Sequence, residues 1–182
     1  MNPSKKIAVV TGASSGIGSV YADRLARRGY DLLLVARRHD RLQSLAAKLE
    51  QAYGIKAETL VADLEKEDDL ARLETILADN PAIRVLVNNA GMARLSPVAE
   101  TPAKNSLSQI ALNITALTRL THAVLPAFKE RNDGVIINIA SVLAVHVLPV
   151  SAVYSGTKAF VLNFSRGLQQ ELANTSIRVQ VV

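Results

Sequence analysis

The stretch that decides the fold reads TGASSGIG at residues 11–18, directly after the apolar run Ile7 to Val10. Glycine permits a tight turn and a close approach of the backbone to a ligand. A helix that begins behind such a turn offers unpaired backbone N–H groups and a positive dipole end, which suit a phosphate. The stretch therefore predicts a phosphate-binding turn between a first strand and a first helix. An ordinary strand-to-helix turn is the alternative at this point.

Short apolar runs alternate with helical patterns along the whole chain, with no internal repeat or linker. The predicted strands are 6–10, 30–36, 56–62, 83–87, 134–139 and 177–182. The predicted helices are 16–28, 38–53, 67–78, 102–128 and 151–173, and the pattern of 102–128 is interrupted near Asn113. Such alternation predicts the α/β class: a doubly wound parallel sheet (a Rossmann fold) in strand order 3-2-1-4-5-6, with helices on both faces in three α/β/α layers. We expect residues 1–182 to form this single domain.

The composition limits the classes of function. The chain has no cysteine, which excludes disulfides and thiolate metal sites and fits a reducing cytoplasm. Its three histidines lack metal-ligand spacing, so we expect no metal. The formal charge of +5 is spread over several predicted helices without a basic run, so we expect no nucleic-acid partner. Polar residues interrupt the apolar segment 135–153, so we expect no membrane span, no membrane partner and a cytoplasmic location.

The end of the second predicted strand points to a phosphorylated dinucleotide. An NAD-binding fold carries an acid there, which accepts hydrogen bonds from the ribose hydroxyls. Here the strand ends at Ala36 and is followed by Arg37 and Arg38, while Asp40 lies on the next helix. A guanidinium pairs well with a phosphate, and cations at a helix N-terminus are otherwise unfavourable. We therefore predict a preference for NADP(H), with Arg37 as the main phosphate contact and Arg38 stacking or assisting.

Polar residues also follow the third and fourth predicted strands. Asp63 and Leu64 follow the third strand, where Asp63 by itself is almost as well explained as a helix N-cap or a turn residue. The sequence NNAG, residues 88–91, follows the fourth strand, where Asn and Gly also suit a plain turn. Ligands of doubly wound sheets bind outside the carboxyl ends of the strands. Both segments are therefore candidate parts of one binding site.

Tyr154 and Lys158 are four residues apart on a predicted helix and so share one face. A free tyrosine has a pKa of about 10, but a cation ~4 Å away stabilises the phenolate by about 4 kcal/mol at an effective dielectric constant of ~20. The pair can thus make tyrosine a proton-transfer group near neutral pH. Ser141 lies just past the fifth strand, where a hydroxyl can hydrogen-bond a substrate carbonyl. Taken one at a time, Ser141 could be a cap or turn residue and Tyr154 could be a half-buried ring of the core. Taken together with the glycine turn, the two residues and Lys158 indicate a catalytic site.

These motifs, in this order, resemble the short-chain dehydrogenase/reductase family along essentially the whole chain. The resemblance rests on TGxxxGxG at 11–18, NNAG at 88–91, Asn113, Ser141 and the YxxxK of 154–158. It implies that Ser141 orients and polarises the carbonyl, and that Tyr154 donates the proton in reduction and accepts it in oxidation. It implies that Lys158 lowers the pKa of Tyr154 and holds the nicotinamide ribose. Asn113, a poor helix former, would hold a water that links Lys158 to solvent; a solvent-facing helix position is its alternative.

The resemblance also implies the reaction and the binding residues. The expected activity is reversible hydride transfer between NADP(H) and a small-molecule carbonyl or secondary alcohol, as in a carbonyl reductase. The implied cofactor contacts are Gly12, Ser14, Ser15, Gly16, Ile17, Gly18, Arg37, Arg38, Asp63, Leu64, Asn89, Ala90, Gly91, Tyr154 and Lys158. The implied substrate wall consists of Ser141, Leu143, His146, Leu148 and Tyr154. A homodimer or homotetramer is expected, because family members often pair through the two long helices.

The chain departs from the family pattern at its end. Family members normally continue past the sixth strand with a Pro-Gly turn, a substrate-covering segment and a further strand, whereas this sequence ends at Val182. We therefore expect a piece of a longer chain, in which the sixth strand presents an apolar edge. Because no cover excludes water, we expect poor turnover from residues 1–182 alone. A non-catalytic dinucleotide-binding module, or an inactive fragment, is the alternative function.

Overall fold

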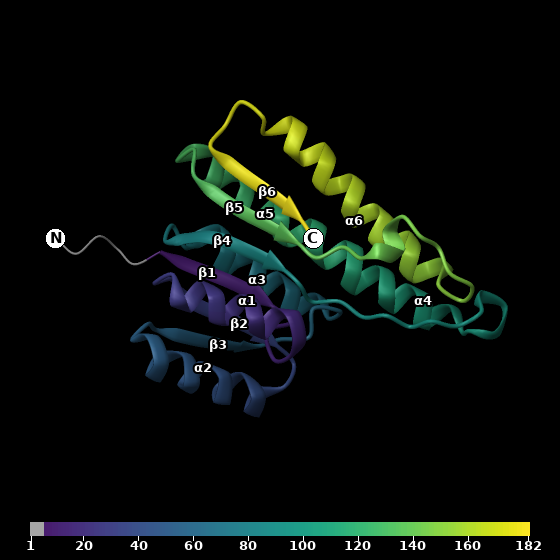
Figure 1. The fold of residues 1–182 in the computed structure, drawn as a ribbon, viewed down its shortest axis with the longest axis horizontal. Helices are drawn as coiled ribbons and strands as arrows, with labels where there is room; N and C mark the ends of the chain where they lie inside the picture. Colours follow the sequence, from purple (N-terminus) through teal and green to yellow (C-terminus); the bar gives the residue numbers. More distant parts are fainter. Residues whose placement is uncertain (1–5) are drawn as a thin grey trace.

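The computed structural model describes residues 6–182, which form a parallel sheet flanked by helices (Figure 1). The strands lie in the order β3-β2-β1-β4-β5-β6, which confirms the predicted doubly wound topology. Their bounds are β1 Ile7–Thr11, β2 Asp31–Ala36, β3 Ala57–Val61, β4 Ile83–Asn88, β5 Gly134–Asn138 and β6 Ile177–Val181. The prediction that residues 1–5 belong to the same domain lies outside the described residues.

Helices cover both faces of the sheet, as predicted. α1 (Gly16–Arg27) and α2 (His39–Tyr53) pack against one face. α3 (Glu67–Asp79), α5 (Leu117–Glu130) and α6 (Ala152–Glu171) pack against the other. The central strands are therefore buried from both sides, which is why their sequences are almost continuously apolar.

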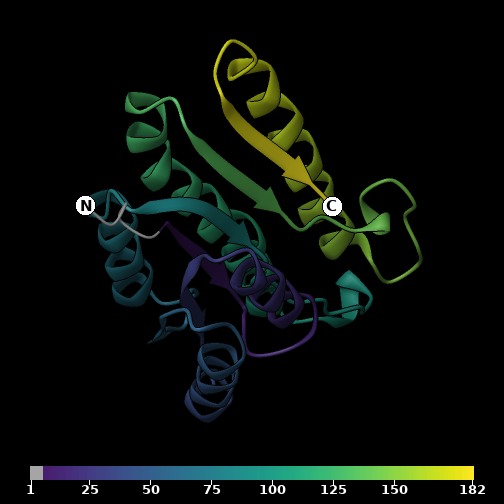
Figure 2. The ribbon, with the colours of Figure 1, turned by 60° about the vertical axis from the view of Figure 1, so that its left-hand side comes forward.

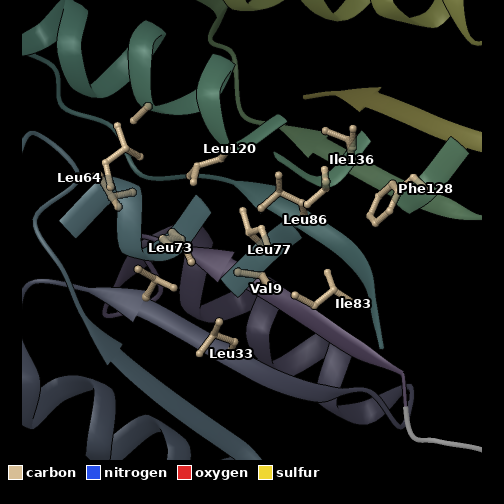
Figure 3. Packing of buried hydrophobic residues seen from close by; sticks show 14 of the residues in the cluster. Val9, Leu33, Leu64, Leu73, Leu77, Ile83, Leu86, Leu120, Phe128 and Ile136 are labelled. Atoms are coloured by element: carbon tan, nitrogen blue, oxygen red, sulfur yellow. The ribbon is translucent and has the colours of Figure 1, made fainter. Parts of the chain in front are cut away.

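The larger core cluster lies between the sheet and the second layer of helices (Figure 3). Val9, Leu86 and Ile136 project from the central strands, and Leu73 and Leu120 meet them from α3 and α5. All of these side chains are essentially excluded from solvent. Complete burial of one side chain of this size stabilises a fold by about 1.5–3 kcal/mol. This packing holds in place the strand ends on which the site is built.

The sixth strand alternates between buried and exposed residues, unlike the central strands. Ile177 and Val179 are buried, whereas Arg178 and Gln180 face outward. This strand lies at the edge of the sheet and α6 covers its inner face. The expectation of an edge strand is confirmed, although only one of its faces is apolar.

The predicted helix 102–128 consists of three segments. α4 (Ala103–Ile110) leads into a π-helical turn, η2 (Ala111–Ala116), and α5 follows without a break. The predicted interruption near Asn113 is therefore confirmed, since this residue lies inside η2. Single π-helical turns occur frequently at functional sites, because the wider turn redirects a side chain.

The connections that follow the strands gather at the carboxyl edge of the sheet (Figure 2). They include the short 3₁₀ turns η1 (Val98–Glu100) and η3 (Val142–Ala144). Figure 2 shows the loop after β5, in green, extending beyond the strand arrowheads. None of the helices within residues 6–182 combines the length and the apolar character needed to span a membrane.

Candidate active site

A cavity of about 840 Å³ opens at the carboxyl edge of the sheet, where the doubly wound topology predicts a ligand. Its walls come from the residues that follow all six strands, from Leu112 of η2 and from the first turns of α6. Most of the predicted site residues line it: Gly12, Ser14, Ser15, Gly16, Ile17, Arg37, Arg38, Asp63, Leu64, Asn89, Ala90, Gly91, Ser141, Tyr154 and Lys158. The fold therefore brings the predicted phosphate turn and the predicted catalytic residues into one space.

The phosphate turn depends on glycine for two different reasons. Gly12 and Gly16 adopt left-handed φ angles of 65° and 57°, which disfavour other residues. Gly18 is buried and does not line the cavity; a Cβ there would lie 2.5 Å from the carbonyl oxygen of Gly12. Ser15 precedes α1 without capping it through its side chain, so the first amides of α1 are available for an anion.

The two arginines after β2 have different partners. Arg38 donates hydrogen bonds to the hydroxyls of Ser14 (2.9 Å) and Ser15 (2.7 Å), which attaches it to the phosphate turn. Arg37 instead lies 3.9 Å from the carboxylate of Glu65, and its side chain is 64% exposed. Both line the cavity, so its rim is positive where β2 ends. The prediction that Arg37 is the main phosphate contact is not decided by this geometry, because Arg38 is the residue already attached to the turn.

Asp63 fulfils the turn role that the sequence left open, and it also lines the cavity. Its Oδ1 accepts a 3.3 Å hydrogen bond from the backbone N–H of Glu65, and its own N–H donates to the Oδ2 of Asp69. The N-cap of α3 is Lys66, so the N-cap alternative for Asp63 is wrong. Leu64 is buried beside it and contributes an apolar wall.

Asn89 ties the loop after β4 to the phosphate turn. Its Nδ2 donates to the carbonyl oxygens of Thr11 (2.8 Å) and Gly12 (3.2 Å). Thr11 adds two more hydrogen bonds between the same segments. Its Oγ1 accepts 3.0 Å hydrogen bonds from the backbone N–H groups of Asn89 and Ala90. Sequence reasoning included Thr11 in the motif at 11–18 but gave it no role, although it lies at the end of the first strand.

Lys158 is buried beside Tyr154. Its Nζ donates a 2.7 Å hydrogen bond to the carbonyl oxygen of Ile139 and lies 5.8 Å from the centroid of the Tyr154 ring. Burial lowers the pKa of Lys158 to about 8, because desolvation disfavours the ammonium. The Tyr154 ring is half-buried and lines the cavity, so its half-buried position is confirmed and its catalytic role stays a prediction. The predicted pair thus faces the cavity from one side of α6.

Ser141 both caps a turn and faces the cavity. It is the N-cap of η3, and its Oγ accepts a 3.1 Å hydrogen bond from the N–H of Leu143. A hydroxyl that accepts in this way still has its proton to donate. Ser141 can therefore donate to a carbonyl oxygen in the cavity, while the cap holds its orientation.

Asn113 is buried, which excludes the solvent-facing alternative. It lies behind the cavity wall and binds the loop after β4. Its Oδ1 accepts from the N–H of Met92 (2.9 Å), and its Nδ2 donates to the carbonyl oxygen of Met92 (3.0 Å) and to the Oγ1 of Thr157 (3.0 Å). Sequence reasoning missed Met92 and Thr157, since nothing in their spacing signals a contact across elements.

The predicted apolar substrate residues lie outside the cavity wall. Leu143, His146 and Leu148 belong to the loop between β5 and α6, where His146 and Leu148 are exposed. This loop is joined to the loop after β4 by a 2.8 Å hydrogen bond from the N–H of Ser96 to the carbonyl oxygen of Val150. The two loops are therefore connected and are called the rim below, and the substrate role of this rim stays a prediction.

Acidic and histidine side chains do not form a metal site in the described part of the chain. No cluster of three or more His, Cys, Asp or Glu residues within 6–182 is arranged to hold an ion.

Comparison with known proteins agrees with this geometry. The model of the family described as short chain dehydrogenase matches residues 6–182. Over 181 residues the chain is 39% identical to very-long-chain 3-oxoacyl-CoA reductase-A of Danio rerio. That match covers 97% of this chain and 56% of the fish protein, so the chain spans little more than half the length of such curated relatives.

Solved structures share the fold. A short-chain dehydrogenase from Sphingobium yanoikuyae in complex with NADPH is 46% identical with a TM-score of 0.94, over 97% of this chain and 69% of that one. The bulky-bulky ketone specific alcohol dehydrogenase from Comamonas testosteroni is 40% identical with a TM-score of 0.95, over 99% of this chain and 72% of that one. These similarities extend over nearly the whole chain and therefore include the cavity.

Proposed function

The chain belongs to the short-chain dehydrogenase family over residues 6–182, and we propose that it is an NADP(H)-dependent oxidoreductase that interconverts a carbonyl group and a secondary alcohol. One observation carries the proposal: Ser141, Tyr154 and Lys158 line the same cavity as the phosphate turn and the two arginines after β2. A dinucleotide-binding module without chemistry could use Lys158 to hold the ribose, but it would not need the hydroxyls of Ser141 and Tyr154 beside it.

The cavity suits a phosphorylated dinucleotide. Gly12 and Gly16 give the turn a backbone that a Cβ would strain, and the first amides of α1 are open to a pyrophosphate. Arg37 and Arg38 add positive charge at the end of β2, where an acid would favour NAD(H). The relative from Sphingobium yanoikuyae was solved with NADPH, which supports the same choice here.

The protein residues handle the carbonyl oxygen. When bound, the nicotinamide cofactor supplies or takes up the hydride. Ser141 has a hydroxyl proton with which to hold and polarise the carbonyl oxygen. Tyr154 gives a proton to that oxygen in reduction and takes it back in oxidation, so each turnover moves one hydride and one proton. The cationic form of Lys158, close to the ring, favours the phenolate that proton transfer leaves behind.

We infer a substrate with a bulky apolar body. The rim exposes five apolar residues: Val142, Val145 and Val147 from the loop after β5, and Leu95 and Val98 from the loop after β4. Exposed apolar side chains gathered in this way fit an apolar ligand. The names of two relatives, a bulky-bulky ketone specific alcohol dehydrogenase and a very-long-chain 3-oxoacyl-CoA reductase, support this class.

The first test is a titration with NADPH and with NADH in which nicotinamide fluorescence reports binding. The second test measures turnover on ketones and 3-oxoacyl thioesters of increasing apolar size. We expect tighter binding of NADPH and turnover that improves with apolar size. Binding without turnover would favour the dinucleotide-binding module. Failure to bind either cofactor would contradict the proposal. The predicted homodimer or homotetramer, and the predicted cytoplasmic location, stay predictions.

A further inference from the structure

Thr157 lies next to Lys158 on α6 but does not line the cavity. The residue is only 2% exposed. Its Oγ1 donates a 2.8 Å hydrogen bond to the carbonyl oxygen of Tyr154 and accepts a 3.0 Å hydrogen bond from the Nδ2 of Asn113. Thr157 therefore joins the helix of the two catalytic side chains to the π-helical turn η2.

The hydroxyl of Thr157 and the backbone of Met92 together fix the orientation of the Asn113 amide. A hydroxyl has a single proton, and here that proton is directed to the carbonyl oxygen of Tyr154. Toward Asn113 the hydroxyl can only accept, so it requires the amide NH₂ group. Together with the carbonyl oxygen of Met92 it occupies both protons of Nδ2. The Oδ1 of Asn113 accepts from the N–H of Met92 and has a second lone pair available.

Gly91 indicates where this amide oxygen points. A Cβ on Gly91 would lie 3.1 Å from the Oδ1 of Asn113 and 3.6 Å from the Nζ of Lys158. The two atoms therefore border the same small space. An ammonium has three donors, of which one is directed to the carbonyl oxygen of Ile139. An acceptor on the opposite side of that space favours the charged form of Lys158.

Burial acts on Lys158 in the opposite direction. Desolvation lowers the pKa of Lys158, because burial disfavours the ammonium. The titratable side chain beside Lys158 is Tyr154, whose ring centroid lies 5.8 Å from Nζ. The Ile139 carbonyl oxygen accepts a hydrogen bond from the ammonium, and a hydrogen bond to the charged form favours that form.

We propose that Thr157 is a positioning residue, which aims the amide oxygen of Asn113 toward Lys158 and so helps to keep the lysine charged beside Tyr154. The expected effect on turnover rests on the proposed function, whereas the expected effect on the protonation of Lys158 does not. Thr157→Val preserves the shape of the side chain and removes the hydroxyl. One buried proton of the Asn113 amide then lacks a partner, and we expect the amide to shift within its two remaining hydrogen bonds to Met92. Thr157→Ser keeps the hydroxyl and is the matched control.

The first measurement titrates Lys158 directly, by NMR of lysine labelled at the side chain, in the cofactor-free protein. We expect the pKa of Lys158 to fall by about 0.5 or more in Thr157→Val and to be restored in Thr157→Ser. Thr157→Ala serves in the same role if the valine variant does not fold. An unchanged Lys158 titration in a folded variant that lacks the hydroxyl overturns the inference, whatever the turnover.

The second measurement is a double-mutant cycle on turnover with Thr157→Val and Asn113→Ala. If Thr157 acts through Asn113, the valine substitution lowers kcat several-fold in the wild-type background and has little further effect in Asn113→Ala. KM for NADPH should change little, because neither residue lines the cavity. Additive losses of kcat contradict the inference. A shifted Lys158 titration in a protein that reduces no carbonyl supports the positioning role and counts against the proposed function instead.

Discussion

The ammonium of Lys158 is held 2.7 Å from the carbonyl oxygen of Ile139, so a cation lies buried where β5 ends. This arrangement gives the lysine a pKa of about 8, because burial disfavours the charged form. The folding energetics and the proposed chemistry therefore depend on the same group.

The stability of the fold is expected to rise as the pH is raised from about 8 toward 10.5, the pKa of an ordinary lysine. In this window the unfolded chain binds more protons than the folded chain, so a higher pH favours the folded state. Below about pH 8 Lys158 is protonated in both states, and the full cost of burying the charge is present. The group changes the free energy of unfolding by about 3 kcal/mol across the window. Urea unfolding at pH 7 to 10 measures how the free energy of unfolding changes with pH. In Lys158→Met the contribution of this lysine to that change should be lost. The same pH dependence in both proteins would contradict the prediction.

Tyr154→Phe is expected to reduce turnover by about 100-fold or more, since a general acid contributes about 10²–10⁴ in rate. The ring and its packing are preserved, so the affinity for NADPH should change by less than about threefold, because hydrogen bonds that remain in place continue to contribute. Steady-state kinetics together with nicotinamide fluorescence separate the two effects. Near-normal turnover in this variant would remove Tyr154 from the mechanism.

Substitution of the two arginines after β2 should have different consequences. Arg37→Ala is expected to weaken NADPH binding by about tenfold and to leave NADH binding unchanged, because a charge-assisted hydrogen bond contributes about 1.5–3 kcal/mol. Arg38→Ala should weaken both cofactors, since it also removes the contacts with Ser14 and Ser15. Dissociation constants from fluorescence titration test this. Arg41→Ala, on the exposed side of α2, is the control. If only Arg38→Ala weakened NADPH binding, Arg38 and not Arg37 would be the main phosphate contact.

Gly18→Ala should destabilise the fold and weaken cofactor binding together. The new Cβ would lie 2.5 Å from the carbonyl oxygen of Gly12 and 2.5 Å from the Nδ2 of Asn89, so the phosphate turn must shift. Overpacking of this kind costs about 1–3 kcal/mol. Gly167→Ala on α6 is the matched control, because a Cβ there meets nothing within 4 Å, and it should stabilise the helix by about 0.5–1 kcal/mol. Chemical unfolding compares the two; equal stability of both variants would contradict the packing role.

The strand order and the position of the cavity could be predicted from sequence, because both follow from local patterns and from general rules of connection. Alternating apolar and amphipathic segments specify a parallel sheet, and right-handed crossovers specify its order. The turn at 11–18 and the residues after each strand then fall at one edge. For the same reason, the interruption near Asn113 was visible as a break in helical periodicity and appears as the π-helical turn η2.

The division of roles within the site could not be predicted in this way. Gly18 proves to be a packing position, and Arg38 rather than Arg37 is attached to the phosphate turn. Leu143 and Leu148 fall outside the cavity wall. Each of these outcomes depends on where a side chain points after the loops have packed, which one-dimensional spacing does not encode.

The sequence by itself determined the fold class and the strand order and indicated the candidate reactive groups, because periodicity and glycine placement act over a few residues. Only the tertiary structure decided how those groups are held. Thr11 reaches Asn89, and Asn113 reaches Thr157, across 78 and 44 positions of the chain. Hydrogen bonds between such distant residues form only when the sheet and its helices have packed, since packing brings the partners within reach and excludes the water that would otherwise compete.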